Sequence, residues 1–506
     1  MSRWRVLVAT VVAIVAIPGV AFATWTATGN GRAYAKADLA PTGARPSVTI
    51  TGRNAAVSWT PAKFTDGTSV QGYTVRRYDA TTGTQAAVGA GCAGLVTTLT
   101  CTEAAIAPGT WWYTVTPVHH NWTGTESPQS LTATVASPSL TLTGSTTLTS
   151  LPGTLSGTIA SFVTGNTVTW RLDNASTGTV LTGSITPSPV PASGSASASI
   201  TIPNGTADGT HTLYAVGSGG ASTASATFTV DALPPVIGAA VIQKSAGGSV
   251  GAIRPGGTYR VYASITDAGS AISSATTNVT NITAGTTAAA LTAGSWTLQG
   301  VAYNYRSAVL TAGGGLTNGA KTFSITATDS NAHTATTGGF SVTVDNSKPS
   351  ASSLSTTNKA GGTVGKAETG DGITFTYSEP MDPSTILAGW DGTASTSVTV
   401  RLLNANGGGG DRVQVWDATN TTQLDLGTVR LGSTGYTTTS LTFTNSTMTV
   451  SGNAFTIVLG TPSAPSTLAV VTSNTKWTPS NAATDLAGNA CQNTASNEAG
   501  APDPEF

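Results

Sequence analysis

The sequence predicts an all-β fold arranged as a string of β-sandwich domains. Short runs of alternating apolar and polar residues, rich in Val, Ile, Thr and aromatic residues, recur from residue 46 to about residue 490. These runs begin and end at Gly, Pro, Asn or Asp residues. No stretch after the first 23 residues shows sustained helical periodicity. With 506 residues, the chain is too long for one sandwich and long enough for several. Closely spaced strands with turn residues between them are typical of sandwiches.

The individual strand signals are alternating segments of four or five residues. They lie at 46–50, 56–59, 73–77, 168–172, 198–202, 374–377 and 413–416. Side chains of a strand alternate between its two faces, so each segment has one face for a core and one for solvent. We therefore expect two-layered domains with small cores.

Repeated junctions divide the chain into domains. Asp208–Ala215 aligns with Asn318–Ile325, and each copy is followed by a strand, an acidic residue and Pro, in Phe228–Pro235 and Val342–Pro349. A looser junction is Thr132–Pro138. Proline stiffens connectors and cannot donate to a sheet, so tandem domains joined this way form an elongated rod. The predicted parts are a linker (24–43), four domains (44–137, 138–232, 233–348 and a larger 349–493) and a C-terminal tail (494–506).

The domain at 44–137 resembles a fibronectin type III domain. The matching segments are Val57–Pro61, Gly72–Val75, Pro108–Thr110 with Tyr113–Val115, and Gly124–Ser127. The resemblance implies that Trp59 is buried between the sheets with Tyr73 beside it. The sequence departs from the family at Trp111-Trp112-Tyr113, where a single tyrosine is usual. Which of these residues makes the corner hydrogen bond of the family stays open.

The other three domains resemble bacterial immunoglobulin-like repeats of large surface proteins. The segments that carry this likeness are Asp208–Ala215 and Ala327–Asp329 in the second and third domains, and Phe375–Pro383 with Ala483–Asn489 in the last. The resemblance implies tandem immunoglobulin-like sandwiches on a bacterial surface. It implies fold and location more than activity.

The first 23 residues have the form of a signal peptide. Arg3 and Arg5 precede an apolar stretch at 6–17, and Ala21-Phe22-Ala23 has the small-x-small pattern of a cleavage site. An uncleaved N-terminal anchor is the alternative, although a stretch of twelve residues, apolar apart from Thr10, is short for a membrane span. We expect a secreted or cell-surface protein that touches a membrane only through this segment, if it is uncleaved.

Low charge restricts the possible partners. Only 9% of the residues are charged and the net charge is -1. A protein with no basic field has no electrostatic means of holding nucleic acid or anionic lipid. The expected partner is an unknown protein or polysaccharide at the cell surface, and self-association is possible because few charges protect the strand edges.

The three cysteines fit an oxidising compartment. Cys92 and Cys101 lie nine positions apart around a turn-rich segment, so they predict a local disulfide. Cys491 is left over and is either free or joined to a second chain. The cysteines and the four histidines show no metal-ligand spacing, and we expect neither a metal site nor a cofactor.

Catalytic motifs are absent from the sequence. There is no Gly-x-Ser-x-Gly elbow, His-Glu-x-x-His pair or phosphate loop, so the chain is not expected to be an enzyme. Glu379 and Asp382 flank Pro380 and are interpreted as turn residues. Calcium at the domain junctions is the alternative for the acidic residues at strand ends and turns, but these also cap turns without a metal. They are Asp231, Asp267, Asp329, Asp345 and Asp485.

Two functional hypotheses remain. The first is a non-catalytic structural or adhesive protein, a modular rod that presents a binding surface or assembles at the cell surface. The second is a carbohydrate-binding accessory protein in which Trp390, Trp416 and Trp477 of the last domain stack on sugar rings. The exposure of these three rings distinguishes the two hypotheses, because a buried ring cannot stack on a sugar.

Overall fold

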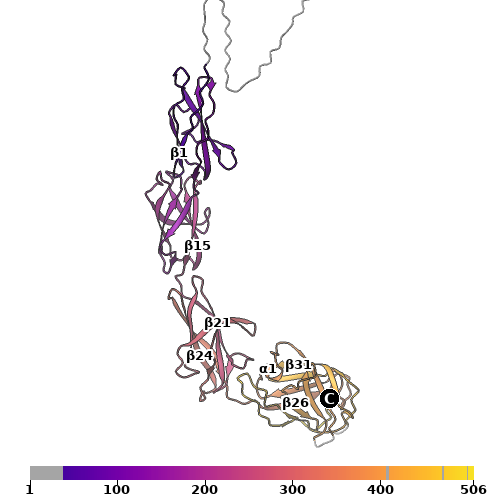
Figure 1. The fold of residues 1–506 in the computed structure, drawn as a ribbon. Helices are drawn as coiled ribbons and strands as arrows, with labels where there is room; N and C mark the ends of the chain where they lie inside the picture. Colours follow the sequence, from indigo (N-terminus) through magenta and orange to yellow (C-terminus); the bar gives the residue numbers. More distant parts are fainter. Residues whose placement is uncertain (1–37, 406–408, 470–471, 499) are drawn as a thin grey trace, which may run out of the picture. The chain divides into compact units, whose positions relative to one another are not determined.

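The computed structural model describes residues 38–405, 409–469, 472–498 and 500–506 and is almost entirely β (Figure 1). Within these residues one helix occurs, the four-residue α1 (Pro383–Ile386). The predicted all-β class of tandem sandwich domains is confirmed. The predicted signal peptide (1–23) lies outside the described residues. The chain divides into two compact units, residues 1–232 and 233–506, which are considered separately.

The first domain of the first unit packs a three-stranded sheet, β1-β2-β5, against a sheet of order β4-β3-β6-β7 in which β8 also pairs with β6. Its strands are β1 (Ser47–Thr51), β2 (Asn54–Ser58), β3 (Gly72–Asp79), β4 (Gln85–Ala86), β5 (Thr100–Glu103), β6 (Gly109–His119), β7 (Trp122–Thr123) and β8 (Ala133–Val135). Trp59 and Tyr73 pack edge to face in the core, with ring centroids 5.3 Å apart. The aromatic pair fills the space between the two sheets.

The second domain contains two four-stranded layers, β9-β11-β14-β13 and β10-β16-β15-β12, linked by the pairing of β12 with β13. Its strands are β9 (Ser139–Thr143), β10 (Thr147–Leu148), β11 (Gly153–Ala160), β12 (Val168–Leu172), β13 (Thr179–Thr186), β14 (Ala196–Ile202), β15 (Gly209–Gly217) and β16 (Thr223–Val230). Leu155, Ile185 and Ile200 point into the core around Trp170.

The outward face of the β9-β11-β14-β13 layer consists of hydroxyl side chains, and we call it the hydroxyl face. Cross-strand pairing aligns Ser184, Ser199, Ser156 and Thr143 in one row. The face consists of the exposed residues Thr141, Thr143, Thr154, Ser156, Thr158, Thr182, Ser184, Thr186, Ser197, Ser199 and Thr201. Strict alternation therefore explains the Ser and Thr enrichment of this segment without any charged side chain.

The third domain opens the second unit with the strand order β17-β19-β22-β21-β20-β24-β25-β18, and β23 pairs with β19. Its strands are β17 (Val236–Lys244), β18 (Ala252–Ile253), β19 (Thr258–Thr266), β20 (Ile272–Asn278), β21 (Ala289–Leu298), β22 (Val301–Ser307), β23 (Leu310–Thr311), β24 (Gly319–Asp329) and β25 (Thr334–Val344). Tyr259, Ile325 and Val342 lie in its core.

The fourth domain has the strand order β26-β27-β32-β31-β28-β29-β30-β34-β35, and β33 pairs with β31. Its strands are β26 (Ala351–Thr357), β27 (Gly372–Tyr377), β28 (Thr396–Leu403), β29 (Arg412–Asp417), β30 (Thr428–Arg430), β31 (Leu441–Ser451), β32 (Ala454–Val458), β33 (Thr461–Pro462), β34 (Lys476–Thr478) and β35 (Ser496–Asn497). Its core holds Phe375, Phe455 and Trp477.

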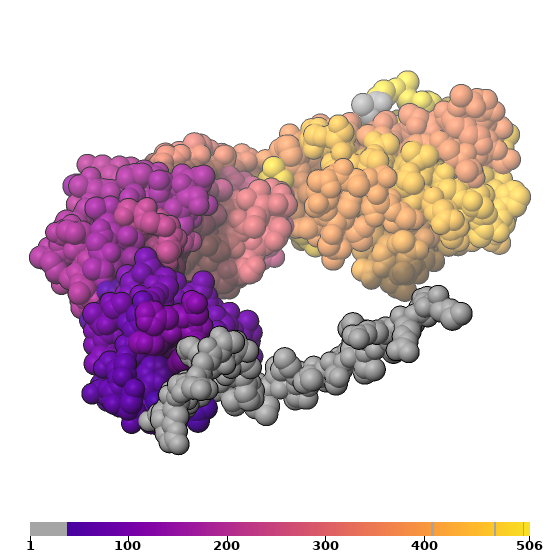
Figure 2. All heavy atoms as spheres, turned by 90° about the horizontal axis from the view of Figure 1, so that it is seen from above, coloured from indigo at the N-terminus to yellow at the C-terminus, as the bar shows by residue number. Residues whose placement is uncertain are grey.

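The expected tail at 494–506 is instead part of the fourth domain. Strand β35 pairs with β34, and Phe506 is 3% exposed within the core. Glu505 is fully buried and accepts hydrogen bonds from the hydroxyls of Thr356 and Thr475. In the space-filling view, yellow and orange atoms lie side by side over the surface of this domain (Figure 2). The segment has no alternating pattern, so its burial could not be predicted locally.

Candidate functional site

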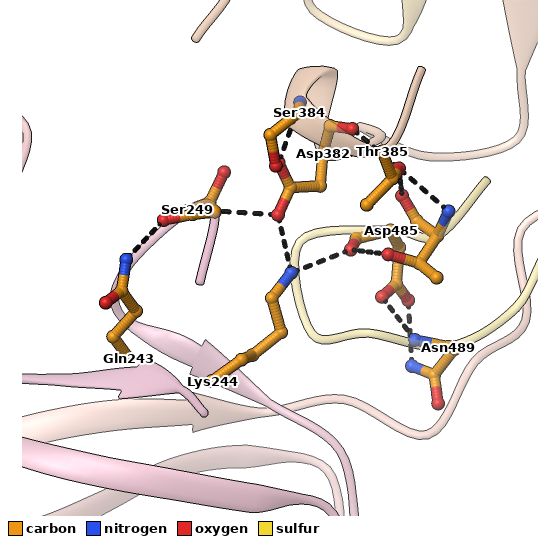
Figure 3. Close-up of polar contacts among 10 residues, drawn as sticks. Gln243, Lys244, Ser249, Asp382, Ser384, Thr385, Asp485 and Asn489 are labelled. Carbon is orange, nitrogen blue, oxygen red and sulfur yellow. Dashed lines mark hydrogen bonds and ion pairs between the residues drawn. The ribbon is translucent and has the colours of Figure 1, made fainter. Parts of the chain in front are cut away.

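A buried ion pair joins the third and fourth domains. Lys244, the last residue of β17, places its Nζ 2.6 Å from Oδ2 of Asp382, which caps the N-terminus of α1 (Figure 3). The Lys244 side chain is 11% exposed and the Asp382 side chain 1% exposed. The Lys244 ammonium also donates to the main-chain oxygen of Asp485 at 3.4 Å. We call this arrangement, with the contacts that follow, the 244–382 joint.

Backbone donors complete the coordination of the Asp382 carboxylate. Ser249 N donates to Oδ2 at 3.0 Å, and Ser384 donates to Oδ1 from its amide at 3.1 Å and from its hydroxyl at 2.7 Å. Gly248 (φ +82°) must be glycine, because a Cβ atom there would lie 2.2 Å from Asp382 Oδ2. Burial opposes ionisation of Asp382, but the hydrogen bonds and charge of Lys244 and the Ser384 contact hold its pKa below the usual value.

A second set of polar groups at the same joint consists of three carboxylates, those of Asp345, Glu379 and Asp485. One oxygen from each lies within 4.8 Å of the others. Asp345 follows β25 at the end of the third domain, whereas Glu379 and Asp485 belong to the fourth. Asn489 connects the two sides, because its Nδ2 donates to Asp345 O at 2.9 Å and to Asp485 Oδ2 at 2.8 Å. We call these three residues the carboxylate cluster.

Three of the six oxygens of the carboxylate cluster, one of Asp345 and both of Asp485, accept hydrogen bonds from the protein. Asp345 Oδ1 accepts from Ser347 N at 2.9 Å and from Asn318 Nδ2 at 3.1 Å. Asp485 Oδ1 accepts from Asn489 N at 2.8 Å. A hard cation needs several oxygens free to converge on it. Asp345 and Asp485 thus have the turn-capping role expected from the sequence, and we assign no metal to the cluster.

Burial and mutual repulsion change the acidity of the carboxylate cluster. Burial first, and then the charges of Asp345 and Asp485, raise the pKa of Glu379 to about 7. Burial also raises the pKa of Asp485. For Asp345, hydrogen bonds from Ser347, Glu379 and Asn346 outweigh burial and lower its pKa. A proton on Glu379 that is donated to Asp345 in a hydrogen bond agrees with the raised pKa values of Glu379 and Asp485 and with the lowered pKa of Asp345.

A cavity of about 280 Å³ adjoins the 244–382 joint. The polar side chains in its lining are those of Lys244, Ser245, Arg254, Thr258, Ser384, Thr385 and Thr484. Its lining contains no carboxylate, imidazole or thiol, so it offers no group that could serve as a general base near neutral pH.

The first unit has its own buried polar joint, centred on Arg53 in the turn after β1. The residue is 2% exposed, and its guanidinium donates to Ile106 O within the first domain. From the same guanidinium, Nη1 donates to Ala221 O and Ser222 Oγ of the second domain at 2.6 Å and 3.2 Å. Gly52 (φ +59°) sits so close that a Cβ atom would lie 2.8 Å from Ala192 O. One side chain thus connects both domains.

The cysteines occupy two different environments. Cys92 and Cys101 form a disulfide, and both are buried in the first domain. Cys491 is a free thiol with 3% exposure in the core of the fourth domain, and burial raises its pKa to about 11. The structure thus describes the first of the two predicted alternatives, a free thiol, and a bond from Cys491 to a second chain stays a prediction.

Replacing both Cys92 and Cys101 with alanine should lower the free energy of unfolding of the first domain by about 2–3 kcal/mol. The bond closes a short loop and restricts the unfolded chain by that amount. Urea denaturation followed by the fluorescence of Trp59 and its neighbours would measure the change. Equal stability of the double variant and the wild type would contradict the prediction, and Cys491→Ala serves as a control in another domain.

The three candidate sugar-binding tryptophans are not grouped on a surface. Trp477 is fully buried and Trp390 is 9% exposed. Trp416 is half-buried and carries the Arg401 guanidinium over its ring at 3.4 Å from the centroid. The structure therefore leaves at most the edge and one face of Trp416 for a ligand.

The histidines serve local contacts. His119 and His120 lie at the β6–β7 turn, with ring centroids 4.5 Å apart. His211 Nδ1 lies 2.9 Å from Asp173 Oδ2, and His333 Nδ1 lies 3.0 Å from Asp329 Oδ2. Asp329 also accepts from the amides of Asn331 and His333, the turn-capping role expected of it.

The residues that sequence reasoning missed are Arg53 and Lys244. Each is one of 22 basic residues in the chain. Asp382 lies 138 positions after Lys244, and Ala221 lies 168 positions after Arg53. The only local signal is the glycine beside each contact, Gly52 and Gly248. Neither glycine is distinguishable by sequence from the other 57 of the 59 in the chain.

Comparisons with known proteins give likenesses of fold alone. No model of a known family matches the chain, and no curated protein matches its sequence. Among solved structures, Sidekick-1 immunoglobulin domains 1–5 are 13% identical with a TM-score of 0.18, over 63% of this chain and 60% of that one. The three N-terminal domains of the bacteriophage RB49 outer capsid protein Hoc are 12% identical with a TM-score of 0.25, over 60% and 99%.

A further likeness is to an I-band fragment of titin, at 12% identity and a TM-score of 0.24, over 62% of this chain and all of that one. The chain thus spans only 60% of the Sidekick-1 structure. At such identities and TM-scores these likenesses carry no argument about this chain. No helix in the described part of the chain is long and apolar enough to cross a membrane.

Proposed function

We propose that the chain is a non-catalytic structural or adhesive protein of a bacterial cell surface, a modular rod that presents a binding surface or assembles there. The observation that carries the proposal is the buried polar joint found in each unit. Arg53 couples the first and second domains, and Lys244–Asp382 couples the third and fourth. A spacer must resist bending at its joints, and buried hydrogen bonds between domains provide that resistance.

Export supports the same function. The predicted signal peptide at 1–23 would direct the chain out of the cell, and a disulfide such as Cys92–Cys101 persists in an oxidising compartment. Exposed strand positions of the hydroxyl face carry no charge that would attract nucleic acid. The partner we propose is a protein or polysaccharide of the cell surface, or a second copy of the chain.

Size-exclusion chromatography with small-angle X-ray scattering on the mature chain, with and without reductant, tests the proposal. We expect an extended monomer whose scattering does not change with reductant, because Cys491 is buried. A compact particle would contradict a spacer function. Reductant-sensitive dimers would contradict the assignment of Cys491 to the core.

Replacing Arg53 with Met should lower the unfolding free energy of the first unit by about 2–3 kcal/mol, because the carbonyls of Ile106 and Ala221 lose their buried donor. Scattering of the variant should also show greater bending between the first two domains. Arg45→Met is the matched control, because Arg45 is exposed in the same domain. Equal stability of the Arg53 and Arg45 variants would show that the joint is not held by the guanidinium.

Carbohydrate binding is the second candidate function, and it now depends on Trp416. A half-buried tryptophan next to Arg401 can contribute to a small binding patch. Titration of the chain with cell-wall polysaccharides, followed by tryptophan fluorescence, tests this candidate. A response that Trp416→Ala abolishes would favour it over the spacer function alone.

A further inference from the structure

Three carboxylates without a cationic partner face one another at the joint between the third and fourth domains. Asp345 lies on one side, and Glu379 and Asp485 lie on the other. Among the described residues, no lysine, arginine or histidine side chain forms an ion pair with any of the three. Three negative charges within 4.8 Å of one another repel strongly in a partly buried place. Something must neutralise at least one of them while the joint is closed.

The neighbouring groups do not provide that neutralisation. Lys244 is held by Asp382 at 2.6 Å and reaches only the main-chain oxygen of Asp485. The thiol of Cys491 is kept protonated by burial, which raises its pKa to about 11, so it carries no charge. Asn489 donates hydrogen bonds across the joint but carries no charge. A proton is therefore the available neutralising group, and Glu379 is the residue that holds it.

We propose that the joint between the third and fourth domains is a pH-sensitive hinge, closed while Glu379 shares a proton with Asp345 and loosened when that proton is lost. The switch acts across the interface, since the donor and the acceptor belong to different domains. Closure keeps intact the hydrogen bonds from Asn489 Nδ2 to Asp345 O and from Gln492 Nε2 to Lys348 O, at 2.9 Å and 3.2 Å. Opening exposes them to water. The inference goes beyond the spacer function and does not depend on it.

The direction of the pH effect follows from the raised pKa of Glu379. A carboxyl whose pKa rises from 4.5 to about 7 on closing favours the closed joint fully below pH 4.5. That preference is lost progressively between pH 4.5 and 7 and stays lost above 7. The opening constant should increase about tenfold per pH unit within this window, and on the order of 10²-fold overall.

The Lys244–Asp382 pair adds a second pH dependence to the stability of the closed joint, and its sign is opposite to that of Glu379. The pKa of Asp382 is lowered from 3.8 by closing, so its contribution is present above pH 3.8 and is lost as the pH falls further. The closed joint is therefore most stable in mildly acidic solution, and its stability falls on both sides of this maximum as the pH changes. This distinguishes the hinge from simple acid denaturation, in which stability falls only on the acid side.

The test is calorimetric unfolding of the full mature chain between about pH 2 and 9 in the presence of EDTA, a range that covers both limbs. The wild type should show a transition of the second unit whose midpoint falls as the pH rises from 5 to 8. Glu379→Gln keeps a neutral hydrogen-bond donor and should remove most of that fall. Glu368→Gln is the matched control, because Glu368 lies in the same domain, near Lys359 and Lys366, and should leave the fall unchanged.

A second readout separates the hinge from general destabilisation. Cleavage of the connector at 345–350 by a protease of broad specificity should become faster as the pH rises from 5 to 7 in the wild type and stay slow in Glu379→Gln, relative to cleavage elsewhere in the chain. A wild-type midpoint that is flat from pH 5 to 8, or one that falls equally in Glu379→Gln, would overturn the proposal. So would a rise in the midpoint on adding calcium at pH 8 that Glu379→Gln abolishes, which would assign the neutralising group to a cation.

Discussion

Lys244→Met is expected to lower the unfolding free energy of the second unit by about 3–5 kcal/mol, because it leaves the Asp382 carboxylate buried without its cation. Methionine retains most of the apolar stem of lysine, so the loss reports the charge rather than the packing. Urea denaturation at pH 6 would measure the change. The Asp382 carboxylate would keep its donors Ser249 and Ser384, which limits the loss to this range.

The control for this variant is Lys321→Met in the same domain. The Lys321 ammonium contacts the Thr317 hydroxyl at the surface, and its removal should cost less than about 1 kcal/mol. If the two variants were equally stable, the 244–382 joint would contribute no more than a surface contact. The double variant Lys244→Met with Asp382→Leu should recover part of the loss, since neither charge then remains buried.

Trp477→Ala is expected to destabilise the fourth domain by about 3–5 kcal/mol, as for other fully buried aromatic side chains. The ring lies 4.9 Å from Tyr377 and 5.3 Å from Phe375, and its Nε1 donates to Leu426 O at 2.7 Å. Removing it creates a cavity and leaves a buried acceptor unsatisfied. Thermal unfolding by circular dichroism would show the loss as a lower midpoint of one transition.

Trp416→Ala is the comparison that separates a core residue from a surface residue. Its ring is half-buried, so the expected loss is about 1 kcal/mol, mostly from the contact with Arg401. A loss as large as that of Trp477→Ala would mean that Trp416 is a core residue, and carbohydrate binding would then have no exposed ring in this set.

The sandwich architecture could be predicted because its signal is local. Leu155 and Ile159 alternate with Ser156 and Thr158 along β11, and the structure buries the first pair and exposes the second. The two joints could not be predicted in this way. The contact between Lys244 and Asp382 depends on how two domains meet, and the sequence around each residue is typical of a strand end and a turn.

The burial of Cys491 could not be predicted from the local sequence either. The sequence left Cys491 either free or bonded to a second chain, and the structure buries its side chain in the core beside Tyr377. The last two residues, Glu505 and Phe506, are buried as well. Hydrogen bonds from Thr356 and Thr475 hold Glu505, and packing against Tyr436 holds Phe506, so neither position follows a period of two. Tertiary contacts of that kind leave no periodic pattern to detect.

The hydroxyl face of the second domain has a consequence for the environments the protein can tolerate. Charged surfaces change their mutual attraction and repulsion with ionic strength, because dissolved ions screen them over about 10 Å at 0.1 M. The eleven Ser and Thr side chains of this face offer only neutral donors and acceptors, which salt does not screen. Its hydration and its contacts should therefore remain nearly the same in fresh water and in brine.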